Sequence, residues 1–286
     1  MSTWHRPESL SAAMTILARL EGRARIIQGG TDVMVACPPQ AVAGDTWLDL
    51  SGVAELQKVD VEADGVLVIG AGVRLAKLRE DPRLYGLWPN LAISAGQTGS
   101  PAIQNRATLG GNICNASPAA DNAPALLVYD AELEISGPGG SYRLPYWSFH
   151  RAYRQTALGP GEIVTRIRLR PPPTGTLHYF RKVGTRAAQA ISKVALAATL
   201  RVDAKQRLVS AAFAFASVAA VPVLAGTLAG GLRERSLTDV TLDEIRRLLA
   251  EDIAAQSDIR STQAYRTEIA ARLVWEFIQS NITTLA

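Results

Sequence analysis

Three consecutive prolines, Pro171–Pro173, constrain the fold of this 286-residue chain more than any other feature. Each proline fixes one backbone torsion and lacks an N–H group, so the run removes three hydrogen-bond donors and stiffens the backbone. We therefore place a domain boundary at this point. One domain is expected over residues 1–173 and a second over residues 174–286.

Before the prolines, the hydrophobic pattern predicts short helices alternating with strands. The expected helices cover residues 9–20, 32–36, 75–84, 91–95 and 123–129, and Pro38–Pro39 is expected to end the second of them. The expected strands cover residues 25–27, 46–50, 56–61, 66–70, 132–136, 141–144 and 162–169. Residues 96–118 follow neither pattern because they are rich in glycine, serine and asparagine, and we expect a long loop there.

After the prolines, the predicted elements come in a different order. Three strands are expected over residues 177–182, 194–202 and 209–216, followed by helices. Thr241 and Glu244 have the spacing of a capping box at the start of one helix. A second helix would carry its apolar residues on one face, namely Tyr265, Ile269, Leu273 and Phe277. This order is typical of α+β domains, so we predict a three-stranded sheet with helices.

The composition argues against several classes of function. The chain is 48% hydrophobic and 20% charged, as globular proteins are, so long disordered segments are not expected. The net charge of +4 comes from scattered basic residues, without the basic runs of nucleic-acid-binding tails. The apolar runs are shorter than the roughly 20 residues that span a membrane, and residues 1–7 lack the apolar stretch of a secretion signal. We expect a soluble, cytoplasmic protein.

A metal site within the chain is not expected. Cys37 and Cys114 are far apart in sequence, whereas zinc and iron–sulfur sites need several ligands at close spacing. The three histidines, His5, His150 and His178, are also isolated from one another. No residue is identified as a catalytic acid, base or nucleophile. Any redox metal chemistry that this protein joins is therefore expected on another chain.

Three glycine-containing turns could bind a cofactor. The segment Val68–Leu75 resembles the start of a dinucleotide-binding fingerprint. Leu75 stands where the third glycine should be, and no clear acidic partner follows at the expected distance. These departures favour an ordinary tight turn for this segment.

The turn within Ile26–Val33 joins a predicted strand to a predicted helix. Gly29 and Gly30 allow successive backbone N–H groups to point into one concavity, which suits a phosphate. Thr31 adds a hydroxyl donor, and the helix that begins near Asp32 adds its positive end. A phosphate-binding loop and a simple strand-to-helix turn are both compatible with this segment.

The segment Thr108–Asp121 is the densest polar stretch of the chain. It offers uncharged hydrogen-bonding groups and one carboxylate, at Thr108, Asn112, Asn115, Ser117 and Asp121. These groups suit a ribityl chain and sugar hydroxyls, and the nearby glycine amides suit a diphosphate. Two structural interpretations stay open, since Asn112 could cap a turn and Asp121 could be the N-cap of the helix over residues 123–129.

Taken together, the two polar loops resemble those of the flavin-binding medium subunit of the molybdenum hydroxylases. That family includes xanthine dehydrogenase and aerobic carbon monoxide dehydrogenase. The first matching motif is Gln28–Asp32, and the second is Ser100–Asn112 leading to Ser117–Asp121. Further similarity lies at Phe180–Arg186 with Ile191–Val194, and at Ser257–Thr262 with Tyr265–Arg266. The resemblance therefore covers nearly the whole chain.

The resemblance implies an α+β protein with an FAD-binding fold of the vanillyl-alcohol oxidase type. Two α/β subdomains, at about 1–55 and 56–173, would enclose the flavin, and the C-terminal α+β domain would follow. Ile26 to Val33 would wrap the diphosphate and the ADP side, while Thr108 and Asn112 would hold the diphosphate and ribityl region. The implied FAD-binding residues are Ile26, Ile27, Gln28, Gly29, Gly30, Thr31, Asp32, Val33, Thr98, Gly99, Ile103, Thr108, Gly110, Gly111, Asn112, Ser117, Asp121, Val164 and Lys182.

Three departures from the family's patterns refine this prediction. Gln104 stands where arginine is frequent, which puts one charge contact in doubt. The four-cysteine insertion of one branch is absent from the sequence, which argues against an extra iron–sulfur cluster on this subunit. Covalent members of the wider superfamily carry a histidine in the first loop, whereas this chain has Thr31 after its two glycines. Non-covalent FAD is therefore expected.

The implied function is electron transfer within a larger complex. A molybdenum cofactor on a large subunit would oxidise the organic substrate, and two iron–sulfur clusters on a small subunit would pass the electrons on. The FAD of this chain would deliver them to an external acceptor, and the complex would be a dimer of heterotrimers. Two other functions stay open: a self-contained FAD-dependent oxidase, which the shortage of histidines disfavours, and a non-catalytic FAD- or nucleotide-binding module.

Overall fold

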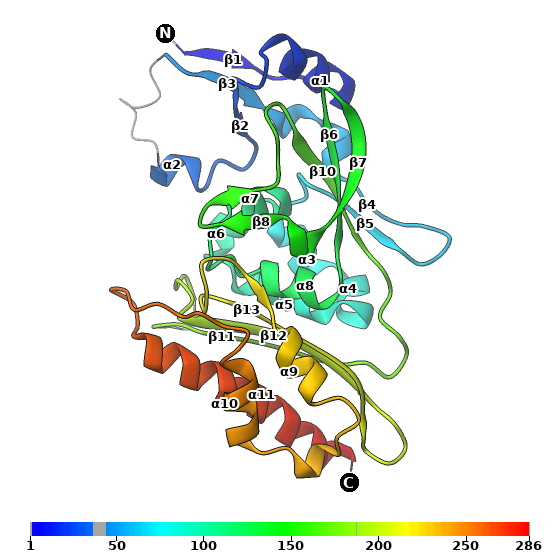
Figure 1. Cartoon of the computed structure of the whole chain (residues 1–286). Helices are drawn as coiled ribbons and strands as arrows, with labels where there is room; N and C mark the ends of the chain where they lie inside the picture. The colour runs from blue at the N-terminus through cyan, green and yellow to red at the C-terminus, as the bar shows by residue number, and fades with distance from the viewer. Residues whose placement is uncertain (1, 37–43, 187, 286) are drawn as a thin grey trace.

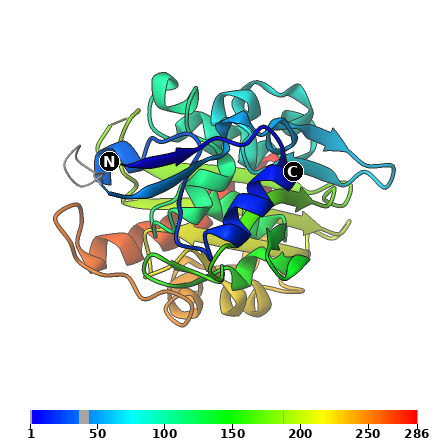
Figure 2. The ribbon, with the colours of Figure 1, turned by 90° about the horizontal axis from the view of Figure 1, so that it is seen from above.

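The computed structural model describes residues 2–36, 44–186 and 188–285 as stacked layers of sheets and helices (Figure 1). Cys37 and Pro38–Pro39, the expected end of one helix, lie outside the described residues. In the view from above, the N-terminal layer lies in front of the others (Figure 2).

The N-terminal layer is a small parallel sheet with one helix. Its strand order is β1-β3-β2, over Thr3–His5, Thr46–Asp49 and Arg25–Ile27. The helix α1 (Leu10–Arg19) begins after Ser9, whose hydroxyl accepts a hydrogen bond from the Ala12 N–H. The helix α2 (Val33–Ala36) follows the first glycine loop. Strand β1 was not predicted, because three residues are too few to show a hydrophobic pattern.

The second layer is a five-stranded sheet in the order β4-β5-β10-β6-β7. Its strands cover Val59–Val61, Leu67–Gly70, Ile163–Leu169, Glu132–Gly137 and Gly140–Pro145. All four pairings are antiparallel, and Ile167 of the central strand pairs with Ile69 on one side and Leu133 on the other. The strand expected over residues 56–61 begins only at Val59, since residues 54–57 form a 3-10 turn.

Helices fill the space between this sheet and the C-terminal sheet. They are α3 (Leu75–Glu80), α4 (Pro82–Leu87), α5 (Pro89–Gln97) and α8 (Ala123–Val128). The helix predicted over residues 75–84 is broken at Asp81, because Pro82 follows and the Asp81 carboxylate accepts from the Arg83 N–H to cap α4.

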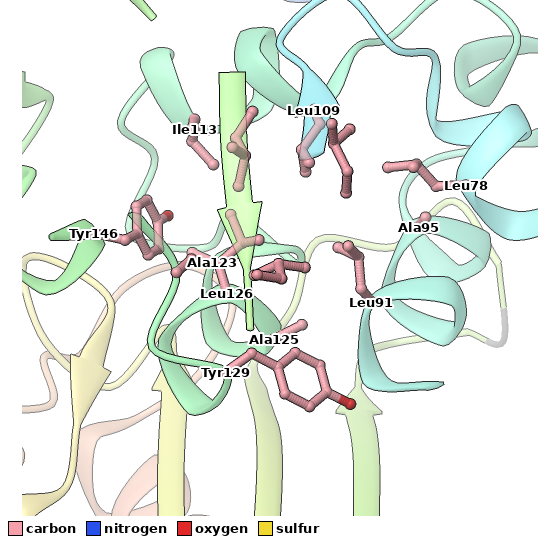
Figure 3. Close-up of a cluster of buried hydrophobic side chains, with 14 of the residues drawn as sticks. Leu78, Leu91, Ala95, Leu109, Ile113, Ala123, Ala125, Leu126, Tyr129 and Tyr146 are labelled. Carbon is pink, nitrogen blue, oxygen red and sulfur yellow. The ribbon is translucent and has the colours of Figure 1, made fainter. Parts of the chain in front are cut away.

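One hydrophobic core joins the two parts of the chain. Leu78, Leu91, Leu109 and Leu126 are fully buried in it (Figure 3). The same cluster includes Phe180, Ala197 and Ala214 from the C-terminal sheet.

The prediction of an uninterrupted loop over residues 96–118 was wrong. This segment contains the end of α5 and two short helices, α6 (Pro101–Gln104) and α7 (Leu109–Cys114). Hydroxyls cap both starts, since Ser100 accepts from the Ile103 N–H and Thr108 from the Gly111 N–H. Such caps satisfy N–H groups at a helix start and offset the low helix propensity of glycine and asparagine.

The C-terminal part is a sheet covered on one face by helices. The predicted strands β11 (Leu177–Val183), β12 (Val194–Val202) and β13 (Leu208–Ala216) are extended by a fourth, the two-residue β14 (Val223–Leu224). Two residues are too few to show a hydrophobic pattern, so the prediction of three strands fell short. The helices are α9 (Gly226–Gly231), α10 (Leu242–Leu249) and α11 (Gln263–Leu285).

The predicted capping box is only half formed. The Thr241 hydroxyl accepts from the Glu244 N–H at 3.2 Å, as expected. The Glu244 carboxylate pairs instead with Arg235, at 2.6 Å. The apolar face of α11 is confirmed for Leu273 and Phe277, which are buried against the sheet.

Candidate functional site

A single cavity of about 1090 Å³ contains both glycine loops in its wall. Of the predicted cofactor residues, every one except Lys182 lines it: Ile26, Ile27, Gln28, Gly29, Gly30, Thr31, Asp32, Val33, Thr98, Gly99, Ile103, Thr108, Gly110, Gly111, Asn112, Ser117, Asp121 and Val164. The structure thus brings together two loops that lie far apart in the sequence. The remaining glycine-containing turn, Val68–Leu75, contributes little to the wall, since residues 68–70 and Leu75 do not line the cavity.

The two glycine loops contact each other directly. A side chain at Gly29 would overlap the backbone carbonyl of Arg106, so only glycine allows this approach. Gly30 has a φ of +75°, which side-chain-bearing residues rarely adopt. The Asn115 side-chain amide donates to Asp32 Oδ1 at 2.9 Å and links the loops a second time.

Two polar side chains of the second loop are held by the loop's own backbone and by the neighbouring Asn122. Thr108 is buried as the cap of α7. Asn112 Oδ1 accepts from Asn122 Nδ2 at 3.1 Å, and no described residue hydrogen-bonds to the Asn112 amide nitrogen. The proposed turn cap at Asn112 is therefore not formed. Asn122, not Asp121, occupies the N-cap position of α8, so that structural interpretation of Asp121 was also wrong.

Asp121 and Lys182 form a buried ion pair at the cavity wall. Lys182 Nζ donates to Asp121 Oδ2 at 2.6 Å and to the Gln97 carbonyl at 2.9 Å. Burial raises the pKa of Asp121 to about 6, and the Lys182 charge partly opposes this shift. Asp121 Oδ1 is buried, and no residue in the described part of the chain forms a hydrogen bond to it. Lys182 therefore lies behind the wall and acts on the cavity through Asp121.

Other titratable groups do not form an acid–base site. Cys114 lines the cavity, but burial raises the pKa of its thiol to about 12. His150 and His178 lie outside the wall, hydrogen-bonded to the hydroxyls of Tyr146 and Tyr129. Among residues 2–36, 44–186 and 188–285, no group of three or more His, Cys, Asp and Glu side chains could hold a metal ion.

The same described ranges contain no helix that is both long enough and apolar enough to cross a bilayer.

Gln104, which stands where the family often has arginine, is buried away from the cavity. Its amide donates to the carbonyls of Gly96 and Thr98, at 2.8 and 3.0 Å. Gln104 therefore holds the backbone of residues 96–98 in place, next to Thr98 and Gly99, which line the cavity.

The C-terminal part contributes a wall that the sequence analysis did not assign. Its lining residues are Gln189, Ala190, Ile191, Ser192, Ser217, Ala219, Ala220, Gln256, Ser257, Asp258, Arg260 and Arg266. Arg266 organises this wall, because its guanidinium donates to the Lys193 and Ser217 carbonyls and to Asp258, at 2.7, 2.9 and 2.7 Å. An almost fully buried arginine needs such partners. The arginine-containing motif over residues 257–266 was the feature of the sequence that could have indicated this C-terminal wall.

The cavity has the size and the lining groups that a dinucleotide needs. Its volume of about 1090 Å³ is slightly above the roughly 300–1,000 Å³ typical of small-molecule sites. Backbone amides of the glycine loops and the Asn112 amide suit a diphosphate and a polyol chain. Asp121 Oδ1 is a buried acceptor without a partner, while Ile103 and Val164 supply apolar wall. A cavity of this kind, on a scaffold of two sheet layers plus a C-terminal sheet, is typical of a dinucleotide-binding flavoprotein.

Comparison with known families agrees with this class. Residues 1–172 match the family model described as the FAD-binding domain in molybdopterin dehydrogenase. Residues 178–281 match the C-terminal domain of the CO dehydrogenase flavoprotein. The chain therefore belongs to the FAD-binding medium subunits of the molybdenum hydroxylases, and it is an oxidoreductase subunit.

Individual relatives are similar over nearly the full length. The chain is 29% identical to the xanthine dehydrogenase FAD-binding subunit of Escherichia coli O157:H7, over 98% of this chain and 96% of the relative. It is 28% identical to the carbon monoxide dehydrogenase medium chain of Afipia carboxidovorans, over 93% and 92%. The structure of reconstituted CO dehydrogenase from Oligotropha carboxidovorans superposes with a TM-score of 0.90 at 26% identity, covering 96% of each chain. The predicted fold class is confirmed.

Proposed function

We propose that this chain holds one non-covalent FAD in the cavity described above and relays electrons through it. The observation that carries the proposal is that two glycine loops, separated by about 80 residues of sequence as the Asp32–Asn115 contact shows, line the same cavity. Bound FAD supplies redox chemistry in which electrons are taken up singly and released singly or as a pair.

The residues of the chain bind and orient the cofactor in this proposal. Backbone N–H groups of Ile26–Val33 hold the diphosphate and the ADP side. Thr108, Gly110, Gly111 and Asn112 hold the diphosphate and ribityl region, and Ser117 belongs to the same wall. Thr98, Gly99, Ile103 and Val164 line the flavin.

Asp121 is proposed to hydrogen-bond to FAD through its unpartnered Oδ1. Lys182 holds the other carboxylate oxygen and thereby fixes the orientation of the group. Because the pKa of Asp121 is about 6, the carboxyl can carry a proton in mildly acidic solution and serve as a donor. Described residues in the cavity wall include no histidine, which disfavours the self-contained oxidase.

The remaining parts of the function concern the partners. Relatives are named medium chain or FAD-subunit, which supports an assembly with other chains. We propose a large subunit with the molybdenum cofactor and a small subunit with two iron–sulfur clusters, arranged as a dimer of heterotrimers with an external electron acceptor. The boundary after residue 173, with subdomains 1–55 and 56–173, and the cytoplasmic location also stay predictions.

Reduction of the purified chain separates the three functions. The chain purified alone should show a flavin spectrum that dithionite bleaches and that xanthine or nicotinate, substrates named for relatives, leave unchanged. Acid treatment should release intact FAD, as expected for non-covalent binding. Bleaching by an organic substrate alone would support the oxidase. A chain that takes up no FAD would support a non-catalytic nucleotide-binding module that has lost its flavin.

A further inference from the structure

The cavity wall contains one arginine that no described residue pairs by hydrogen bond or salt bridge. Arg154 lines the cavity, and its guanidinium carbon lies 5.9 Å from the centre of the Tyr153 ring, its neighbour. The other two arginines of the wall form ion pairs with Asp258. Arg266 donates to its carboxylate at 2.7 Å, and Arg260 lies 3.6 Å from the same group. Arg154 is therefore the wall cation that is available to a ligand.

A short hairpin places this arginine. The strands β8 (His150–Ala152) and β9 (Gln155–Thr156) pair antiparallel, with Tyr153 and Arg154 at the turn between them. Arg154 has a φ of +54°, in the left-handed region that side-chain-bearing residues rarely adopt. Both turn residues line the cavity, so the hairpin presents its turn to the site.

Arg154 lines the same cavity as the residues of the first glycine loop. Burial raises the pKa of Asp32, and the positive charge of Arg154 opposes that shift. The guanidinium thus lies within electrostatic range of the residue that directly follows Gly29, Gly30 and Thr31. The Asp32 carboxylate accepts a hydrogen bond from Asn115, which holds it against the second glycine loop.

This arrangement leaves a need for positive charge at the first loop. A diphosphate is an anion, and the ionised carboxylate of Asp32, which belongs to the first loop and lines the cavity, would repel it. The neutral amides of the glycine loop provide hydrogen bonds but no net charge. Guanidinium groups match phosphate oxygens with two parallel N–H donors, which a single ammonium group cannot do.

We propose that Arg154 binds the diphosphate of FAD and supplies its counter-charge. The proposal rests on the function argued above and adds a residue that neither the motifs nor the polar loops indicated. Arg154 is a cofactor-positioning residue in this role: it fixes the ADP half of the cofactor against the first loop and takes no part in the redox step.

The test compares Arg154→Ala and Arg154→Lys with Arg151→Ala, a matched control at an exposed arginine of the same hairpin that does not line the cavity. Full-length chain stripped of flavin is titrated with FAD, ADP and adenosine. In Arg154→Ala, the affinities for FAD and ADP should fall by about 10- to 100-fold, the range expected for a charged hydrogen bond, while adenosine binding stays unchanged. Arg154→Lys should be intermediate, because it keeps the charge and loses the two-pronged geometry.

Salt provides a second measurement. The FAD affinity of the unaltered chain should weaken more with added sodium chloride than that of Arg154→Ala. Unchanged ADP and FAD affinity in Arg154→Ala, or an equal loss for ADP and adenosine, would overturn the role of Arg154 while the unaltered chain still binds FAD. Failure of the unaltered chain to bind FAD would overturn both this inference and the proposed function.

Discussion

The stability of the folded chain depends on keeping both members of the buried ion pair between Asp121 and Lys182. Their side chains are 9% and 7% exposed, and each is the other's charged partner. Removing one member of a buried pair leaves the other charge uncompensated, which costs more than the pair itself contributes.

Asp121→Asn should therefore lower the free energy of unfolding by about 3 kcal/mol at pH 8, where Asp121 is ionised, because Lys182 would keep a buried charge. The double variant Asp121→Asn with Lys182→Met should recover most of that loss. Urea unfolding of the flavin-free chain measures both. A double variant no more stable than the single one would show that the pair is not coupled in this way. Asp60→Ala, at an exposed carboxylate, serves as the control.

His150 makes the stability of the chain sensitive to acid. Burial lowers the pKa of His150 from 6.5 to about 4. The unfolded chain takes up a proton on this residue at a higher pH than the folded chain does, so the stability contribution is complete above pH 6.5 and is lost as the pH falls toward 4.

The free energy of unfolding should fall by on the order of 3 kcal/mol between pH 6.5 and pH 4 because of His150. His150→Gln cannot take up this proton, so its free energy of unfolding should fall less steeply between pH 6.5 and pH 4. Denaturant unfolding at a series of pH values gives the slope for both proteins. Identical slopes would contradict the role of His150. The pKa of His178 is lowered in the same direction by burial, so some acid sensitivity should persist in the variant.

At the level of single residues, the sequence identified side chains near the cavity by their chemistry but could not supply their partners. Asn112 and Asp121 stood out as polar groups in a glycine-rich stretch. Their contacts to Asn122 and Lys182 depend on helix packing and on the C-terminal sheet, which no local pattern encodes. Arg154 was missed because an arginine in a short turn gives no motif.

Among the structural elements, the pair of glycine loops is the one on which the site depends. Gly29 meets the backbone of Arg106, so the first loop can approach the second only where a side chain is lacking. Backbone atoms cannot move aside as the end of a flexible side chain can.

Gly29→Ala should separate the loops, weaken FAD binding by more than 10-fold and lower the free energy of unfolding by about 1–3 kcal/mol, as overpacking does. Gly86→Ala is the matched control, because Gly86 lies in α4 and an added methyl group there would meet nothing within 4 Å. The control should bind FAD normally and be equally or slightly more stable. Normal FAD binding by Gly29→Ala would show that the loop contact is not needed.

Elements with a strong repeating pattern were predicted well, and short capped elements were not. The long strands β12 and β13 are close to the predicted ranges because nearly every inward residue is apolar. The helices α6 and α7 were missed because their composition favours loops, although Ser100 and Thr108 are capping residues at the right positions. The hairpin of β8 and β9 is too short to show alternation.

At the scale of the whole molecule, the cavity is lined by both parts of the chain. The N-terminal layers supply the glycine loops, and the C-terminal part supplies the wall organised by Arg266. A buried cluster that includes Phe180 and Leu126 joins the two parts beside it. The sequence separated these parts at the triple proline, and the family resemblance assigned only Lys182 of the C-terminal part to the cofactor site. The C-terminal wall itself was not predicted, because it arises only from packing.

The most direct measurement is an experimental structure of the full-length chain with FAD. Density for the diphosphate should lie between residues 26–33 and 108–112, with the ring system extending toward Asp121 and the C-terminal wall. FAD bound elsewhere, or a diphosphate in contact with only one of the two glycine loops, would contradict the proposal that these loops together form the cofactor site.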